Sequence, residues 1–184
     1  MIVFTTVFGV LWGVVETILG SYLHLFRVPF TGSVLAAIGA VIMCTERLYT
    51  PVFGATLTTG VIAAALKCFS VGTVRLSPAI AISVEALVAE IILSALGTGR
   101  MALFLASLAC CLEGMPHVVI AQWLTYGQGI IPAYLKIIGK FQSSLGLGEN
   151  LWWQALLLWA AVHVAIGIAA GLGAVAVKAY LRRE

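Results

Sequence analysis

Ionisable side chains interrupt the long apolar stretches of this sequence, and these are the groups that could do chemistry. At about 100° per residue on a helix, Gly9, Gly13, Glu16, His24 and Arg27 fall in one narrow stripe. The stripe carries small residues at one end and polar residues at the other. A charged side chain at the centre of a bilayer costs at least about 2.5 kcal/mol. Such residues therefore indicate either a binding site or a buried partner.

Similar patterns recur in later apolar stretches. Glu113 and His117 lie one helical turn apart, and His163 follows small residues. The rise of about 1.5 Å per residue places Glu16, Glu113 and His163 near the middle of the membrane. The other polar groups lie nearer one membrane surface. We call this surface side B, and it holds the loop after the first helix. The predicted ligand-binding cavity opens toward side B, and its substrate-binding residues are His24, Arg27, Lys67, Arg75, Glu85, Glu113 and His117, with Glu16 and His163 as pocket or relay residues.

Two structural alternatives stand beside the cavity hypothesis. The polar groups could pair with one another, for example Glu113 with His117, and serve only to fix the helices. Gly9 and Gly13 form a close-approach motif, which would serve either packing within the bundle or coupling to another subunit.

Several classes of chemistry find no support in the sequence. Glu113 and His117 lack a third ligand at matching spacing, so no metal site is predicted. The chain has no Asp, no H-E-x-x-H, no Gly-x-Ser-x-Gly and no phosphate-binding loop, which argues against an enzyme and against a bound cofactor. A net charge of +3 without runs of like charge argues against nucleic acid as a partner.

The elements that must position these residues are membrane helices. Of 184 residues, 62% are hydrophobic and only 9% charged, so the expected solvent is the lipid bilayer. We predict an all-α integral membrane protein with one transmembrane domain over 1–184, a bundle of six transmembrane helices. The expected helices are 4–26, 31–44, 51–66, 77–96, 101–124 and 151–181, with an interfacial segment at 130–141 that is too polar to span.

Six crossings place both chain ends on one side, called side A. The 10 Lys and Arg residues divide evenly between the two sides, so the positive-inside rule does not decide orientation. The C-terminal cluster of Lys178, Arg182 and Arg183 is an ordinary flanking tail. We therefore predict a multi-pass protein of the cell membrane whose termini are cytoplasmic.

Five short segments carry a family resemblance. They are Leu11–Glu16, Leu23-His24, Pro29–Gly32, Leu76–Ile80 and Val84–Leu87. Together with the small size, the six expected helices and the absence of a nucleotide site, they resemble uncharacterised members of the S-components, the substrate-binding membrane subunits of energy-coupling factor (ECF) type ABC transporters.

The resemblance implies that this chain captures a vitamin-like micronutrient from outside. A transmembrane coupling subunit and ATP-hydrolysing subunits would then drive uptake. The family's Ala-x-x-x-Ala coupling motif would map to Gly9 and Gly13, on the same stripe as Glu16 and Arg27. Either the coupling surface lies elsewhere, or the polar residues above it are not ligands.

The charged residues predict the ligand and leave two other functions open. Cations on side B suit an anionic group and the carboxylates suit an amine or ring N–H, so a small charged or amphoteric ligand is expected. An ion- or proton-coupled small-solute carrier would use Glu16, Glu85 and Glu113 as a relay. A non-transporting membrane assembly subunit would use the small-residue faces for packing alone.

Overall fold

The computed structural model describes residues 2–26, 28, 30–69, 76–127, 129–146 and 152–183. Within these residues every regular element is an α-helix. In chain order they are α1 (Ile2–Leu25), α2 (Thr31–Tyr49), α3 (Ala55–Cys68), α4 (Leu76–Leu96), α5 (Arg100–Tyr126), α6 (Ile130–Leu145) and α7 (Trp152–Leu181).

Five of the described helices, α1, α2, α4, α5 and α7, are long and apolar enough to cross a membrane. α3 is apolar but has only 14 residues, about 21 Å at 1.5 Å per residue, which is less than a bilayer core of about 30 Å. The structure therefore supports an all-helical protein of membrane type, with five helices of spanning length where the sequence predicted six.

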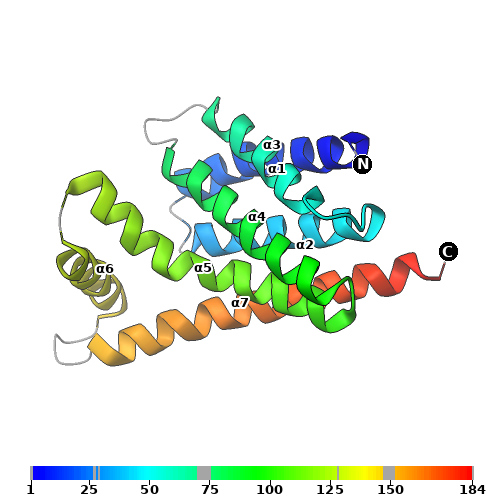
Figure 1. Cartoon of the computed structure of the whole chain (residues 1–184). Helices are drawn as coiled ribbons and strands as arrows, with labels where there is room; N and C mark the ends of the chain where they lie inside the picture. Colours follow the sequence, from blue (N-terminus) through cyan, green and yellow to red (C-terminus); the bar gives the residue numbers. More distant parts are fainter. Residues whose placement is uncertain are drawn as a thin grey trace.

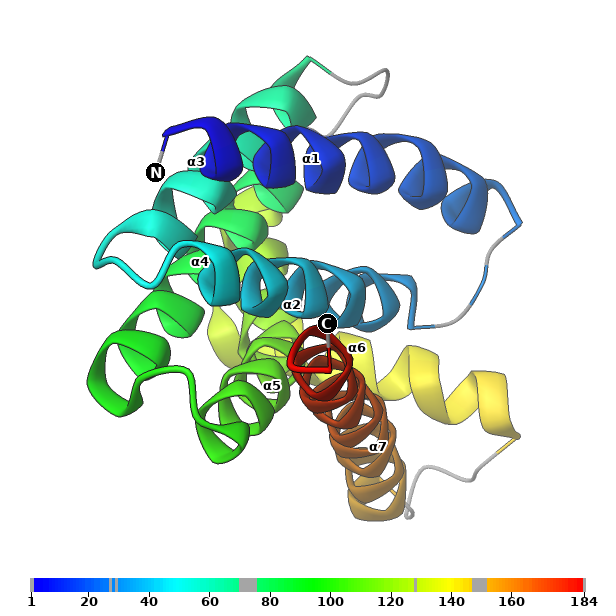
Figure 2. The ribbon, with the colours of Figure 1, turned by 90° about the vertical axis from the view of Figure 1, so that its right-hand side faces the viewer.

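α2 is the central helix of the bundle. It contacts α1, α3, α4, α5 and α7, and it is the most buried of the five long helices (Figure 2). It is also the least hydrophobic of the five. A helix that its neighbours shield from lipid can carry more polar side chains, provided that they find partners inside the protein.

α2 continues five residues beyond the predicted end at Cys44, through Glu46 and Arg47. Both charged side chains are buried, whereas the sequence pattern placed them in a loop. Arg47 forms an ion pair of 3.2 Å with Glu90 of α4 and donates a hydrogen bond to the backbone carbonyl of Val52. This partnership accounts for the burial of Arg47 within the helix, whereas the carboxylate oxygens of Glu46 have no hydrogen-bond partner among the described residues.

Glu90 also holds the N-terminus of α3. Its carboxylate accepts hydrogen bonds from the backbone N–H groups of Gly54 (2.9 Å), Thr56 (3.0 Å) and Leu57 (3.2 Å). Gly54, with φ at 83°, precedes α3 and has no side chain to accept these bonds. A carboxylate from another helix therefore replaces the usual N-cap side chain and meets the positive end of the α3 dipole.

Glycines allow the helices to approach closely. A Cβ added at Gly9 or Gly13 would lie 2.8 Å from side-chain atoms of Ile62 or Leu66 of α3. At Gly60 of α3, an added Cβ would lie 2.1 Å from the Cβ of Ala86. The Gly9–Gly13 face of α1 is therefore a packing surface against α3 inside the bundle.

α6 stands apart from the other helices. Figure 1 shows it at the end of the molecule opposite both chain termini, and its contacts are with α5 and α7 only, among the described elements. It covers the predicted interfacial segment 130–141 and continues to Leu145. Its position matches side B of the sequence analysis, and both termini lie at the other end of the molecule.

Candidate functional site: a cavity under α6

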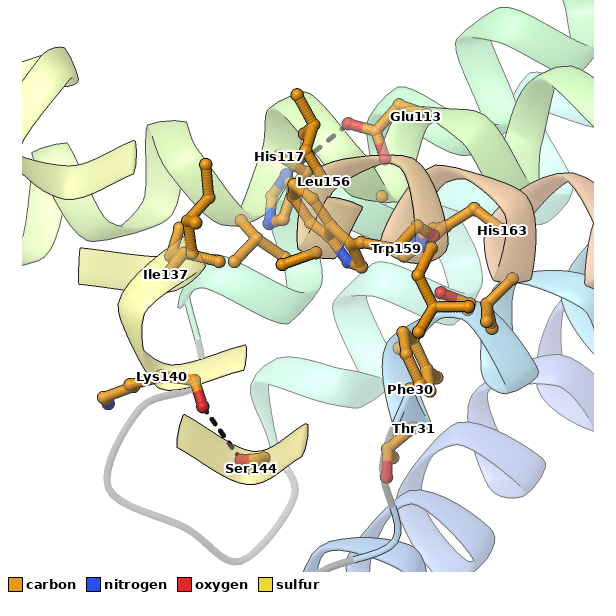
Figure 3. Close-up of a pocket in the computed structure, with 18 of the residues that line it drawn as sticks. Phe30, Thr31, Glu113, His117, Ile137, Lys140, Ser144, Leu156, Trp159 and His163 are labelled. Carbon is orange, nitrogen blue, oxygen red and sulfur yellow. Dashed lines mark hydrogen bonds and ion pairs between the residues drawn. The ribbon is translucent and has the colours of Figure 1, made fainter. Parts of the chain in front are cut away.

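A cavity of about 830 Å³ lies at the side B end of the bundle. Its wall is built from the start of α2 and from α4, α5, α6 and α7 (Figure 3). The volume is within the range of pockets that hold small organic ligands. The polar and aromatic lining residues used below are Phe30, Thr31, Glu85, Glu113, His117, Lys140, Ser144, Trp159 and His163.

Two carboxylates lie on the α4 and α5 walls of the cavity. Glu85 is 6% exposed, and the Glu113 side chain is 11% exposed. The Oε2 atom of each has no hydrogen-bond partner among the described residues. Buried carboxylate oxygens are normally hydrogen-bonded, because leaving them without a partner costs several kcal/mol when the group is charged. Glu85 and Glu113 are therefore the lining residues whose carboxyl oxygens are left unsatisfied.

His117 joins the Glu113 carboxylate to α4. Its Nδ1 lies 3.5 Å from Oε1 of Glu113, and its Nε2 lies 3.3 Å from the hydroxyl oxygen of Ser77. Figure 3 shows the ring and the carboxylate facing each other across one turn of α5. The contact orients Oε1 of Glu113, while its Oε2 is buried without a partner among the described residues.

His163 has a defined tautomer in this arrangement. Its Nδ1 lies 2.9 Å from the backbone carbonyl oxygen of Trp159, and a carbonyl oxygen can only accept a hydrogen bond. Nδ1 therefore carries the proton, and Nε2 of the neutral ring is an acceptor. An added Cβ at Gly114 would lie 3.7 Å from this Nε2 atom, so the acceptor is next to the cavity wall of α5.

Aromatic rings surround His163. The Trp159 ring meets it edge-on with centroids 5.4 Å apart, and the Phe30 ring does so at 5.8 Å. Phe30 has φ at 59°, a left-handed conformation that costs a non-glycine residue about 1 to 3 kcal/mol. The strained backbone directly before α2 places an aromatic side chain at the cavity, where Figure 3 shows it pointing toward His163.

α6 closes the remaining side of the cavity with a mixed surface. Ile137 and Ile138 line the cavity, and Ile138 is 3% exposed. Lys140 is exposed, and Figure 3 shows its side chain directed away from Glu113 and His163. The Ser144 hydroxyl donates to the backbone carbonyl of Lys140 at 2.9 Å. α6 thus lines the cavity with Ile137 and Ile138 beside Lys140 and Ser144, and the Lys140 side chain extends away from Glu113 and His163.

The structure separates the predicted site residues into groups. Glu85, Glu113, His117 and His163 come together in the cavity. Glu16 and Lys67 are not among its lining residues: they form a buried ion pair of 3.4 Å between α1 and α3, and Lys67 also donates to the Glu16 backbone carbonyl at 2.7 Å. Arg27 and Arg75 lie outside the described residues, and so does the side chain of His24.

The Glu16–Lys67 pair explains how one stripe of α1 can combine glycines with a charge. Gly9, Gly13 and Glu16 all face α3, and the glycines pack while the carboxylate meets the lysine. The stripe therefore turns toward a neighbouring helix, and the cavity lies elsewhere in the bundle.

The sequence prediction did not include Phe30, Thr31 or Ile138 as site residues. The amphipathic pattern of 130–145 was the available signal, because a helix of that kind must cover an apolar surface with one face. Nothing in the local sequence around Phe30 shows that its ring would meet His163, since the two residues are far apart in the chain.

In the described part of the chain, no three His, Cys, Asp or Glu residues come together in a way that could hold a metal ion. No known family model, curated protein or solved structure matches the chain. The site is therefore interpreted from its own geometry.

Proposed function

We propose that this protein captures a small organic ligand within the membrane and that the cavity under α6 is its binding site. The observation that carries the proposal is the combination of about 830 Å³ of space with two buried carboxylate oxygens that have no partner among the described residues. Glu90, which lies away from the cavity, is paired with Arg47, and the Glu46 carboxylate, also away from the cavity, has no hydrogen-bond partner among the described residues; what distinguishes Glu85 and Glu113 is that they line the cavity as well.

In the finer form of this proposal, the chain is the substrate-capture subunit of an ECF-type micronutrient transporter. Side B faces outward, the termini are cytoplasmic, and α3 is a short sixth crossing. A coupling subunit and ATP-hydrolysing subunits supply the energy. The sequence resemblance and the position of the cavity at the end opposite the termini support this form. We assign Gly9 and Gly13 to helix packing, because α3 covers them.

A proton-coupled carrier is the second candidate, and one observation favours it. Glu85 and Glu113 both line the cavity with an unpartnered oxygen, as the proton-binding groups of a carrier would. A carrier moves its substrate across liposomes that contain this protein alone when a pH gradient is imposed. A capture subunit binds the substrate but moves none until its energising partners are added.

The binding proposal is tested by thermal stability of the detergent-solubilised protein against a panel of vitamins and vitamin precursors. A ligand at 100 times its dissociation constant stabilises by about 2.7 kcal/mol, which a melting curve resolves. At least one compound should raise the melting temperature, and the rise should increase with the concentration of that compound. A panel without any shift would count against ligand capture.

A matched pair of glycine variants shows whether the cavity is the site. Gly32 lines the cavity and Gly139 does not, and a Cβ added at either meets no atom within 4 Å. Gly32→Trp should weaken or abolish the shift, because the indole occupies part of the space that the ligand needs, whereas Gly139→Trp should retain it. Equal shifts in the two variants would place the ligand elsewhere.

A further inference from the structure

Hydrogen-bond acceptors are prominent among the polar groups of the cavity, beside the indole N–H of Trp159 and the hydroxyl of Ser33, which can donate. Glu85 Oε2 and Glu113 Oε2 can only accept while they are ionised, and His163 Nε2 accepts because Nδ1 carries the proton. Two hydroxyl groups of the lining already donate to backbone carbonyls: Thr31 to Val28 at 2.7 Å, and Ser144 to Lys140. Their remaining capacity is also to accept.

Positive charge is scarce among the described lining residues. Lys67, which the sequence assigned to the site, is engaged with Glu16 between α1 and α3. Lys140 lines the cavity but is exposed and turned away from the carboxylates. His117 directs Nδ1 toward Glu113, so its donor serves that contact.

Carboxylate oxygens without partners in a half-open, partly apolar pocket select one class of partner. We propose that the ligand is an organic cation: a protonated amine or amidinium group on an apolar or aromatic body. This inference rests on the proposed binding function and names its substrate class. The cationic group lies between Glu85 and Glu113, where its N–H groups donate to the free carboxylate oxygens and to Nε2 of His163.

The rest of the cavity suits the body of such a ligand. Trp159 is 9% exposed and stands beside His163, and Phe30 flanks the same ring. Ile137 and Ile138 cover the opposite side from α6. Aromatic faces also attract cations, so the rings add to the selection made by the carboxylates.

The comparison that isolates charge uses three probes with one indole skeleton: tryptamine, indole-3-propionamide and indole-3-propionate. They are cationic, neutral and anionic near neutral pH, and their bodies are nearly identical. Their dissociation constants are measured on the purified full-length protein by thermal shift. Tryptamine should bind at least about tenfold more tightly than the other two, which corresponds to about 1.4 kcal/mol.

Glu85→Gln and Glu113→Gln each replace a carboxyl group, which can pair with a cation as a carboxylate, by a neutral amide of the same shape. Each should reduce the preference for tryptamine to less than about threefold while leaving indole-3-propionamide binding within twofold. Glu46→Gln is the matched control, because Glu46 is also a fully buried carboxylate and does not line the cavity. The Glu46→Gln variant should prefer tryptamine over the other two probes as strongly as the unmodified protein does.

The inference and the proposed function fail in different ways. Equal or tighter binding of the anionic probe, a preference that both glutamine variants retain, or no binding of any of the three probes would overturn the organic-cation assignment. Ligand capture would still stand if the vitamin panel gave a shift that Gly32→Trp removes. If no compound of the vitamin panel gave such a shift, both ligand capture and the organic-cation assignment would be overturned.

Discussion

Two buried glutamates on the same helix, five residues apart, have opposite surroundings. Glu90, at the side A end of α4, is met by Arg47, Ser94 and the N-terminus of α3. Glu85, at the cavity, has an oxygen without a partner among the described residues. The first carboxylate joins three helices, and the second faces a space large enough for a ligand.

The difference shows how a charged residue in a membrane protein is to be interpreted. Burial by itself does not separate a structural charge from a functional one, because both glutamates are almost completely buried. Satisfaction of the hydrogen-bonding atoms separates them. Removing a charge should therefore cost stability at side A and ligand binding at side B.

The largest effect is expected from breaking the side A network. Arg47→Met removes the partner of Glu90 and leaves a carboxylate buried, which destabilises proteins by about 3 to 5 kcal/mol. Unfolding of the detergent-solubilised protein by added denaturing detergent measures the change. An unchanged unfolding midpoint would show that this network does not hold α2, α3 and α4 together.

A somewhat smaller effect is expected at the ion pair between α1 and α3. Lys67→Met should cost about 3 kcal/mol because Glu16 is then buried without its partner. The double variant Glu16→Gln, Lys67→Met should recover at least half of that loss, since the uncompensated charge is gone. Ligand binding should persist in the double variant, and its disappearance would return these two residues to the site.

The packed and hollow regions can be compared through two glycines. Gly60→Ala should cost about 2 kcal/mol, because the new methyl group would lie 2.1 Å from Ala86 Cβ at the contact of α3 with α4. Gly114→Ala at the cavity should change stability by less than about 0.5 kcal/mol, because its nearest neighbour would be 3.7 Å away. Thermal unfolding of both variants measures the contrast, which similar losses would contradict.

The smallest effect on folding is expected where the effect on function is largest. Glu85→Gln should alter stability by less than about 1 kcal/mol or raise it, because an amide of the same shape replaces a buried carboxyl group whose Oε2 has no partner in the described residues. The melting temperature without ligand measures this. A loss as large as that of Arg47→Met would mean that Glu85 is structural, and the contrast between the two glutamates would disappear.

The sequence by itself determined the helical, membrane-type character of the chain and most of its helix positions. Apolar stretches of spanning length leave the backbone no other way to satisfy its hydrogen bonds in lipid. The helical repeat and the estimated depth in the membrane also grouped Glu113, His117 and His163 as inward-facing residues. The structure brings these three residues together with Glu85 at one cavity.

Only the tertiary structure decided which of the inward-facing charges are paired. Glu16, Glu85 and Glu90 look alike in the sequence, since each is a carboxylate in an apolar helix. Lys67 reaches Glu16 across 51 residues of chain, Arg47 reaches Glu90 across 43, and Glu85 Oε2 is reached by none of the described residues. Such partnerships depend on which helices become neighbours. Helical periodicity shows on which side of its helix a residue lies, but it does not show which residues of another helix pack against that side.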